Sequence, residues 1–246
     1  MEKLNRLTLK DFLVQREIDV DSLMVTFLRR MAEEQPLLSQ VEINFISPDE
    51  EPNTGGFFDV IELGEGKFVP TIFIVTEQTN HMVALMKNRQ TSIEMSASML
   101  ALSFENMTPR LLRLFIIAHE LGHATDYIKN YEKYGGIQEW REHYEANLLL
   151  LPVTGLDPAE LQSEISGCKS LEEFFSVFPS LRKSINLLGI KTLSELQRAQ
   201  EIAYRTSPYE SYADNFAAEF IKRNAVKLGL QEMLSEENKF ILKRAA

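Results

Sequence analysis

Five consecutive residues in the middle of the chain, His119-Glu120-Leu121-Gly122-His123, carry the side chains with the clearest chemical potential. The two histidines are four positions apart, so on a helix their imidazoles would share one face and could bind one metal ion. Glu120 would lie beside that metal without binding it, where a carboxylate can take a proton from a water molecule. The spacing therefore predicts Zn²⁺ bound by His119 and His123, with Glu120 as the catalytic base.

The setting of this motif strengthens the prediction. An H-E-x-x-H pattern specifies only three positions and also occurs by chance. Here it stands inside the apolar stretch LLRLFIIAHELGHA, where two histidines and a glutamate without a metal would be costly to bury. Gly122 would also allow another backbone or a substrate to come close to the helix. The context favours a metal site.

A third protein ligand is needed for a catalytic zinc site, and the segment PYESYADNFAAEFI at 208–221 offers one. Glu210 and Asp214 would share a helix face, so Glu210 could bind the metal while Asp214 accepts a hydrogen bond from a ligand histidine. From spacing alone, however, the favoured interpretation is that both carboxylates belong to the solvent-exposed side of an amphipathic helix.

The two motifs together resemble the zincin metallopeptidases whose third ligand is a glutamate, and most of all the ImmA/IrrE-type metallopeptidases. The likeness is carried by RLFIIAHELGH and by E-x-x-A-D-x-F-A-A-E, and it covers about residues 96–131 and 208–222. The E-x-x-A-D element is also similar to that of HtpX-like membrane peptidases, and HELGHATDY is similar to lethal-factor-type toxin peptidases.

This resemblance implies a complete metal site. Zinc would be bound by His119, His123 and Glu210, with Glu120 as general base and Asp214 as the partner of a ligand histidine. The resemblance also implies that SASMLALSF, at 96–104, is the strand along which an extended peptide substrate binds through main-chain hydrogen bonds.

One departure from the family concerns the distance between the motifs. His123 and Glu210 are 87 positions apart, whereas ImmA/IrrE-type proteins usually have a much shorter gap. The segment REHYEANLLLLP, at 141–152, partly repeats the second motif and makes His143 the alternative third ligand. Glu210 is preferred because its motif is fuller, and residues 132–207 are then predicted to be a helical insertion.

The elements that must position these residues can be predicted from periodicity and turn signals. Helix is predicted over about 8–34 and from Thr108-Pro109 to about Tyr131, and the chain after Gly136 is predicted to be helical. Strands are predicted at 41–47, 57–63 and 67–77, with a hairpin near Gly64-Glu65-Gly66 and with Pro70 marking an edge or a break. The segment 96–104 could be either strand or helix by periodicity.

These elements predict an α+β, zincin-like fold. A small N-terminal mixed sheet would pack on the central helix that carries the H-E-x-x-H motif, followed by a mostly helical second half. Residues 1–246 are predicted to form a single metallopeptidase domain, with 132–207 as the insertion.

Composition limits the possible partners. The 246 residues carry a formal net charge of −10, which argues against broad nucleic-acid binding. The longest apolar stretches are too short to span a bilayer, and the first residues lack the apolar core of a signal peptide. The single cysteine, Cys168, is interpreted as structural and excludes an intramolecular disulfide. We therefore expect a cytoplasmic protein that binds a protein or peptide substrate and neither nucleic acid nor membrane.

Taken together, the residues and the resemblance predict a zinc metalloendopeptidase that cleaves a specific protein substrate, in the manner of regulatory proteolysis. A non-catalytic, zinc-stabilised interaction module is the first alternative, although a structural site has no need of Glu120. A toxin-like effector peptidase is the second.

Overall fold

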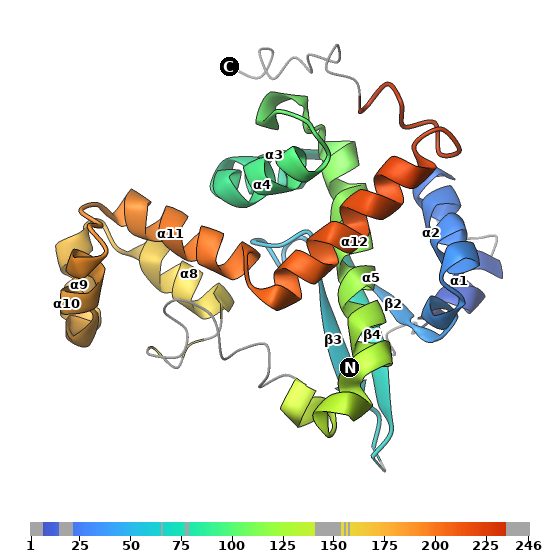
Figure 1. Cartoon of the computed structure of the whole chain (residues 1–246), viewed down its shortest axis with the longest axis horizontal. Helices are drawn as coiled ribbons and strands as arrows, with labels where there is room; N and C mark the ends of the chain where they lie inside the picture. Colours follow the sequence, from blue (N-terminus) through green and yellow to red (C-terminus); the bar gives the residue numbers. More distant parts are fainter. Residues whose placement is uncertain are drawn as a thin grey trace. The chain divides into compact units, whose positions relative to one another are not determined.

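The computed structural model describes residues 7–14, 22–64, 66–76, 79–140, 154, 156 and 158–234. The chain divides into two compact units, of which the first is Met1–Lys133 with Tyr212–Ala246 and the second is Tyr134–Ser211. Figure 1 shows the elements in chain order. Each unit is described below by itself, and the assignment of 1–246 to a single domain stays a prediction.

The first unit contains a mixed sheet of four strands. These are β1 (Leu7–Thr8), β2 (Glu42–Ile46), β3 (Gly56–Glu62) and β4 (Phe68–Val75), in the order β1-β2-β4-β3. Strands β2 and β4 are parallel, while the two outer pairs are antiparallel. The small N-terminal mixed sheet of the α+β prediction is confirmed.

The β3–β4 hairpin lies where the sequence predicts it. The N–H of Leu63 donates to the carbonyl of Lys67 at 2.9 Å, and Gly64 and Gly66 have positive φ angles of 92° and 71°. Strand β4 is an interior strand, and not the edge strand that its proline suggested. Pro70 is nevertheless tolerated, because it pairs with Val60 of β3 and lies just before Thr71, where the pairing with β2 begins.

Two helices precede the sheet's second strand. They are α1 (Leu9–Val14) and α2 (Ser22–Glu34), followed by the 3₁₀ helix η1 (Pro36–Gln40). A single helix over 8–34 was the prediction, and its middle, 15–21, lies outside the described residues. Helix α2 buries residues at helical spacing against the core: Met24, Phe27, Leu28 and Met31.

The segment between the sheet and the motif is helical. Helices α3 (Thr79–Asn88) and α4 (Gln90–Met99) are followed by the 3₁₀ helix η2 (Phe104–Asn106). The strand that the resemblance implied at 96–104 is therefore wrong. The physical reason is the burial pattern of α4, whose buried residues Ser92, Ile93, Ser96 and Ala97 follow helical periodicity instead of alternation.

Helix α5 (Pro109–Tyr134) is the central element of the first unit. It begins as predicted, because Thr108 Oγ1 accepts a hydrogen bond from the N–H of Leu111 at 3.1 Å and proline occupies the first helical position. It ends three residues later than predicted, at two glycines of positive φ, Gly135 and Gly136. Its buried residues lie between Leu111 and Tyr127, so the motif stands in the core.

The second unit is built of short helices around a core of its own. They are α8 (Pro158–Gly167), α9 (Leu171–Val177), the 3₁₀ helix η3 (Pro179–Leu181), α10 (Arg182–Leu187) and α11 (Leu193–Arg205). The core consists of Leu161, Ile165, Phe174, Phe175, Leu181, Ile185, Ile190 and Leu196. A capping box of Thr192 and Glu195 opens α11. The helical character predicted for 132–207 holds for its described residues.

Helix α12 (Pro208–Asn224) carries the second motif. The boundary between the two units falls inside this continuous helix, after Ser211. From Tyr212 onward the helix belongs to the first unit, where Arg223 bonds Glu34 of α2 at 2.8 Å. No helix among the described residues is both long enough and apolar enough to cross a membrane.

Candidate metal centre

Helix α5 places His119 and His123 on one face, as residues four apart require. Their Nε2 atoms lie 2.9 Å apart, and the two rings are perpendicular, with centroids 4.5 Å apart. The ligand atoms of His119, Glu120 and His123 all lie within 4.8 Å of one another, and all three side chains are buried. The motif therefore forms a group that could hold a metal ion.

Asp214 of α12 holds one of these imidazoles. Its Oδ1 accepts a hydrogen bond from Nδ1 of His119 at 2.8 Å, in a setting where both side chains are less than a tenth exposed. A neutral imidazole that donates through Nδ1 presents a lone pair at Nε2, the atom that faces His123. The bond thus orients His119 in the form that binds metal.

The contact between α5 and α12 depends on a glycine. A Cβ atom added to Gly122 would lie 2.9 Å from Cα of Ala213 and 3.3 Å from its Cβ, closer than real Cβ atoms approach backbone. Ala213 is itself completely buried. Gly122 and Ala213 therefore let the two helix backbones approach closely, and this approach brings Asp214 to His119. The sequence predicted that another backbone or a substrate could come close to Gly122, and in the structure the backbone of α12 does so at Ala213.

The donor set suits a divalent metal such as zinc. Two ligand nitrogens at the usual zinc distance and tetrahedral angle are about 3.3 Å apart. The observed distance of 2.9 Å between the Nε2 atoms is a few tenths of an ångström shorter than this. A small rotation of either ring would lengthen it to the distance that zinc requires. Imidazole and carboxylate groups are ordinary zinc ligands, and burial disfavours leaving such groups without a partner.

Glu210 lies outside the group of three. It belongs to the second unit, is 1% exposed, and its Oε2 accepts a hydrogen bond from Nη1 of Arg205 at 3.2 Å. Because α12 is continuous, Glu210 stands one helical turn before Asp214 and on the same side of that helix. Its role as third ligand stays a prediction, and His143 falls outside the described residues.

Arg205 is a polar residue of this region that sequence reasoning missed. Arg205 is the last residue of α11, and a cation at the C-terminal end of an amphipathic helix is common and usually exposed to solvent. The structure instead buries it, with Gln200 and Glu201 of the same helix. Its position five residues before Glu210 was the available signal, but the two residues lie on different helices joined by a turn, so helical spacing did not reveal their contact.

Tyr212 and Asp126 lie on the two helices that carry the motifs. Burial, followed by the negative charge of Asp126, raises the pKa of the Tyr212 phenol above its ordinary value. Asp126 in turn accepts a hydrogen bond from Asn130 at 2.7 Å. Tyr212 is therefore a protonated hydrogen-bond donor throughout the neutral range.

The edge strand beside α5 is β3, since among the described strands it pairs with β4 alone. An added Cβ at Gly56, the first residue of β3, would lie 3.4 Å from Cγ2 of Ile116, and the ring of Phe58 lies 6.0 Å from that of Tyr127. These contacts lie on either side of the motif, so β3 runs alongside it (Figure 1).

The surroundings of Cys168 disfavour the thiolate form of its side chain. Burial, followed by the charges of Glu173 and Glu164, raises the pKa of its thiol above the ordinary value. The residue packs against the core of the second unit. A thiol with a raised pKa is a poor nucleophile at neutral pH, which agrees with a structural role.

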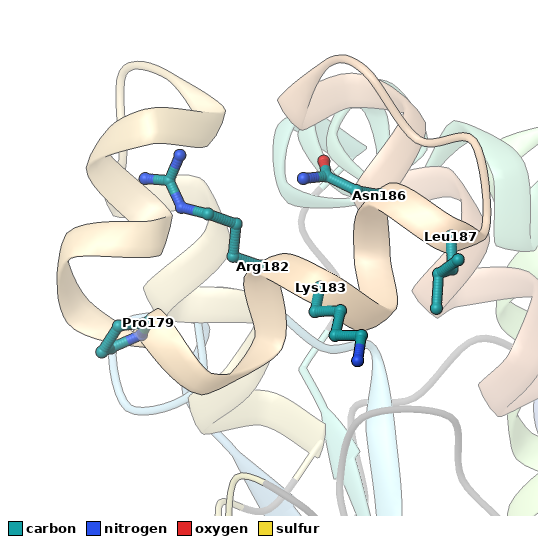
Figure 2. A pocket seen from close by; sticks show the side chains of 5 residues that line it. All are labelled: Pro179, Arg182, Lys183, Asn186 and Leu187. Atoms are coloured by element: carbon teal, nitrogen blue, oxygen red, sulfur yellow. The ribbon is translucent and has the colours of Figure 1, made fainter.

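A separate hollow of about 560 Å³ opens on the surface of the second unit, shown in Figure 2. Arg182 lines it, bonds Glu172 at 2.7 Å and stacks over the ring of Phe175 at 4.6 Å. The residues that line the hollow are Pro179, Arg182, Lys183, Asn186 and Leu187. None of them has an imidazole, carboxylate or thiol group, so the hollow offers none of these metal ligands.

Comparisons of the chain with protein-family models, with curated proteins and with solved structures find no match.

Proposed function

We propose that this chain is a zinc-dependent metallopeptidase with a zincin fold. The observation that carries the proposal is the buried, perpendicular pair of imidazoles at His119 and His123, with Asp214 bonded to the first and Glu120 within the same group. A metal bound only for stability has no need of an extra carboxylate beside it, whereas a hydrolytic site needs a base.

Glu210 is proposed as the third ligand. It is a carboxylate one helical turn before the residue that bonds His119, and carboxylate oxygens are ordinary zinc ligands. Three protein ligands leave a coordination position for water, which a hydrolytic site requires.

The chemistry then follows from the residues. A zinc ion, when bound, supplies a Lewis acid that lowers the pKa of a water molecule and polarises a substrate carbonyl. Glu120 takes a proton from that water as its oxygen bonds to the carbonyl carbon, and passes the proton to the amide nitrogen as the C–N bond breaks. Asp214 keeps the His119 ring oriented throughout, and the buried helix excludes bulk water.

The proposed substrate is an extended segment of a specific protein. Strand β3 runs alongside the motif, and extended peptides are commonly bound beside a strand through main-chain hydrogen bonds. The resemblance to ImmA/IrrE-type metallopeptidases implies that the cleavage is regulatory, which is an argument from analogy.

The test compares the zinc-loaded wild type with Glu120→Gln on a peptide library prepared from a digested proteome. Mass spectrometry of new N-termini should detect cleavage by the wild type and a loss of at least a hundredfold in Glu120→Gln, because a general base contributes about that much. Equal cleavage by both proteins would refute the mechanism. Zinc binding by both proteins with cleavage by neither would favour the zinc-stabilised interaction module.

A further inference from the structure

The hollow on the second unit lies against the short helix α10 and combines apolar with polar side chains. Residues four apart on a helix lie on one side of it, so Lys183 and Leu187 project together, as Arg182 and Asn186 do (Figure 2). Pro179, in the 3₁₀ helix before α10, also lines the hollow. All five residues are exposed, so a partner can reach an ammonium, an amide and an apolar surface together.

Large apolar side chains are exposed on this part of the second unit. Leu187 exposes 79% of its surface, and Leu188 and Val177 expose 56% and 52%. The residue of α10 that packs in the core is Ile185, which is completely buried, so Leu187 is not needed to fill that core. A single exposed apolar residue is ordinary, whereas several within 177–188 are typical of a surface that binds another molecule.

Charge distinguishes this surface from the rest of the chain. The whole chain has a net charge of −10, but residues 174–194 contain the cations Arg182, Lys183 and Lys191 and no carboxylate. The charge of Arg182 is offset, because its two terminal nitrogens bond the carboxylate of Glu172 at 3.1 and 2.7 Å. Lys183 forms no ion pair with any residue that the structure describes. The hollow therefore presents one ammonium without an opposite charge.

We propose that this hollow docks a short segment of a partner protein in which a carboxylate lies beside a large apolar side chain. The carboxylate pairs with Lys183, the apolar side chain lies against Pro179 and Leu187, and Asn186 bonds the backbone of the segment. The hollow has a volume of about 560 Å³, which is enough for a few side chains.

The charge of the hollow favours such a segment over other anionic partners. Nucleic acids and anionic membranes are bound by clusters of cations, because each contact neutralises one phosphate or headgroup. A single unmatched ammonium in the hollow of a chain with net charge −10 suits one acidic residue instead. The hollow and the group of His119, Glu120 and His123 belong to different units, so the inference goes beyond the proposed function and does not depend on zinc.

The test selects short random peptides displayed on phage for binding to the full chain. The double variant Lys183→Glu, Leu187→Asp is present in excess during the selection, which removes peptides that bind elsewhere. Enriched peptides should carry Asp or Glu beside a large apolar residue. Fluorescence anisotropy of one labelled peptide from the selection then gives its dissociation constant for each protein.

Single substitutions separate the two contacts. Lys183→Gln should weaken binding of the selected peptide about twofold to fivefold, because an exposed ion pair is lost. Leu187→Ser should weaken it about tenfold, because an apolar contact is lost. Lys169→Gln and Val226→Ser are the matched controls, since they replace an exposed lysine and an exposed apolar residue that do not line the hollow, and they should bind as the wild type does.

Three results would overturn the inference. They are an absence of enriched peptides, enriched peptides without a carboxylate, and a peptide that Lys183→Gln and Leu187→Ser bind as tightly as the wild type. Phosphatidylserine vesicles and duplex DNA are titrated in parallel, and Lys183-dependent binding to either, with no acidic peptide selected, would assign the surface to that other class of partner. None of these measurements involves zinc, so their failure leaves the proposed metal centre standing. Circular dichroism of each variant establishes that it is folded.

Discussion

Nδ1 of His119 lies 2.8 Å from Oδ1 of Asp214, although the two residues are 95 positions apart in the sequence. This hydrogen bond connects the motif helix α5 to α12. It depends on the close approach of the two backbones at Gly122 and Ala213. The orientation of a candidate ligand is thus determined by the way two distant helices pack.

Removing the Asp214 carboxylate should weaken metal binding without unfolding the chain. In Asp214→Ala, His119 loses the partner of its Nδ1, and the zinc dissociation constant should rise by about tenfold to a hundredfold. Asp214→Asn retains a carbonyl oxygen that can accept the same hydrogen bond, and should lose less. Zinc titration in the presence of a competing chelator measures both variants. Wild-type affinity in Asp214→Ala would show that the bond has no role in metal binding.

Gly122→Ala should destabilise the packing of α5 against α12. The added methyl group meets Cα of Ala213 at 2.9 Å, and overpacking of this kind costs about 1–3 kcal/mol. Urea unfolding of the metal-free protein measures the loss. Gly167→Ala serves as the control, because a Cβ at Gly167 meets nothing within 4 Å and should change the stability by less than about 0.5 kcal/mol. Equal stabilities of the two variants would contradict the close helix approach.

Much of the site could be predicted from sequence because its information is local. His119, Glu120 and His123 lie within five residues on one helix, and Thr108 and Pro109 mark the start of that helix. The segment 96–104 was misassigned because a short apolar run fits either a strand or a helix. The pairing of Arg205 with Glu210 was missed because it depends on the turn between two helices.

Acid should reduce the contribution of Glu34 to stability. Although burial acts against ionisation, hydrogen bonds from Arg223, Asn224 and Arg30 and the charge of Arg223 lower the pKa of Glu34 below its ordinary value. A lowered pKa in the folded state means that the stabilisation is present above the unfolded-state pKa, about 4.3, and is lost as the pH falls through the folded-state pKa. This carboxylate bonds Arg223 of α12 at 2.8 Å.

Glu34→Gln should therefore be less stable than the wild type at pH 7, and the difference should shrink at pH 3. Urea denaturation at the two pH values measures the free energy of unfolding of each protein. Glu33→Gln is the comparison, because Glu33 is more exposed and bonds Arg30 alone among the described residues. A difference of the same size at pH 7 and pH 3 would contradict this account of Glu34.

The zinc content of the purified chain tests the central claim most directly. After dialysis against metal-free buffer, inductively coupled plasma mass spectrometry should find about one zinc ion per chain in the wild type and in Glu120→Gln, because Glu120 is not a ligand. His119→Ala and His123→Ala, each folded by circular dichroism, should retain almost none. A wild type that cannot be loaded with zinc, or a His123→Ala variant that keeps its zinc, would contradict the metal centre proposed for this chain.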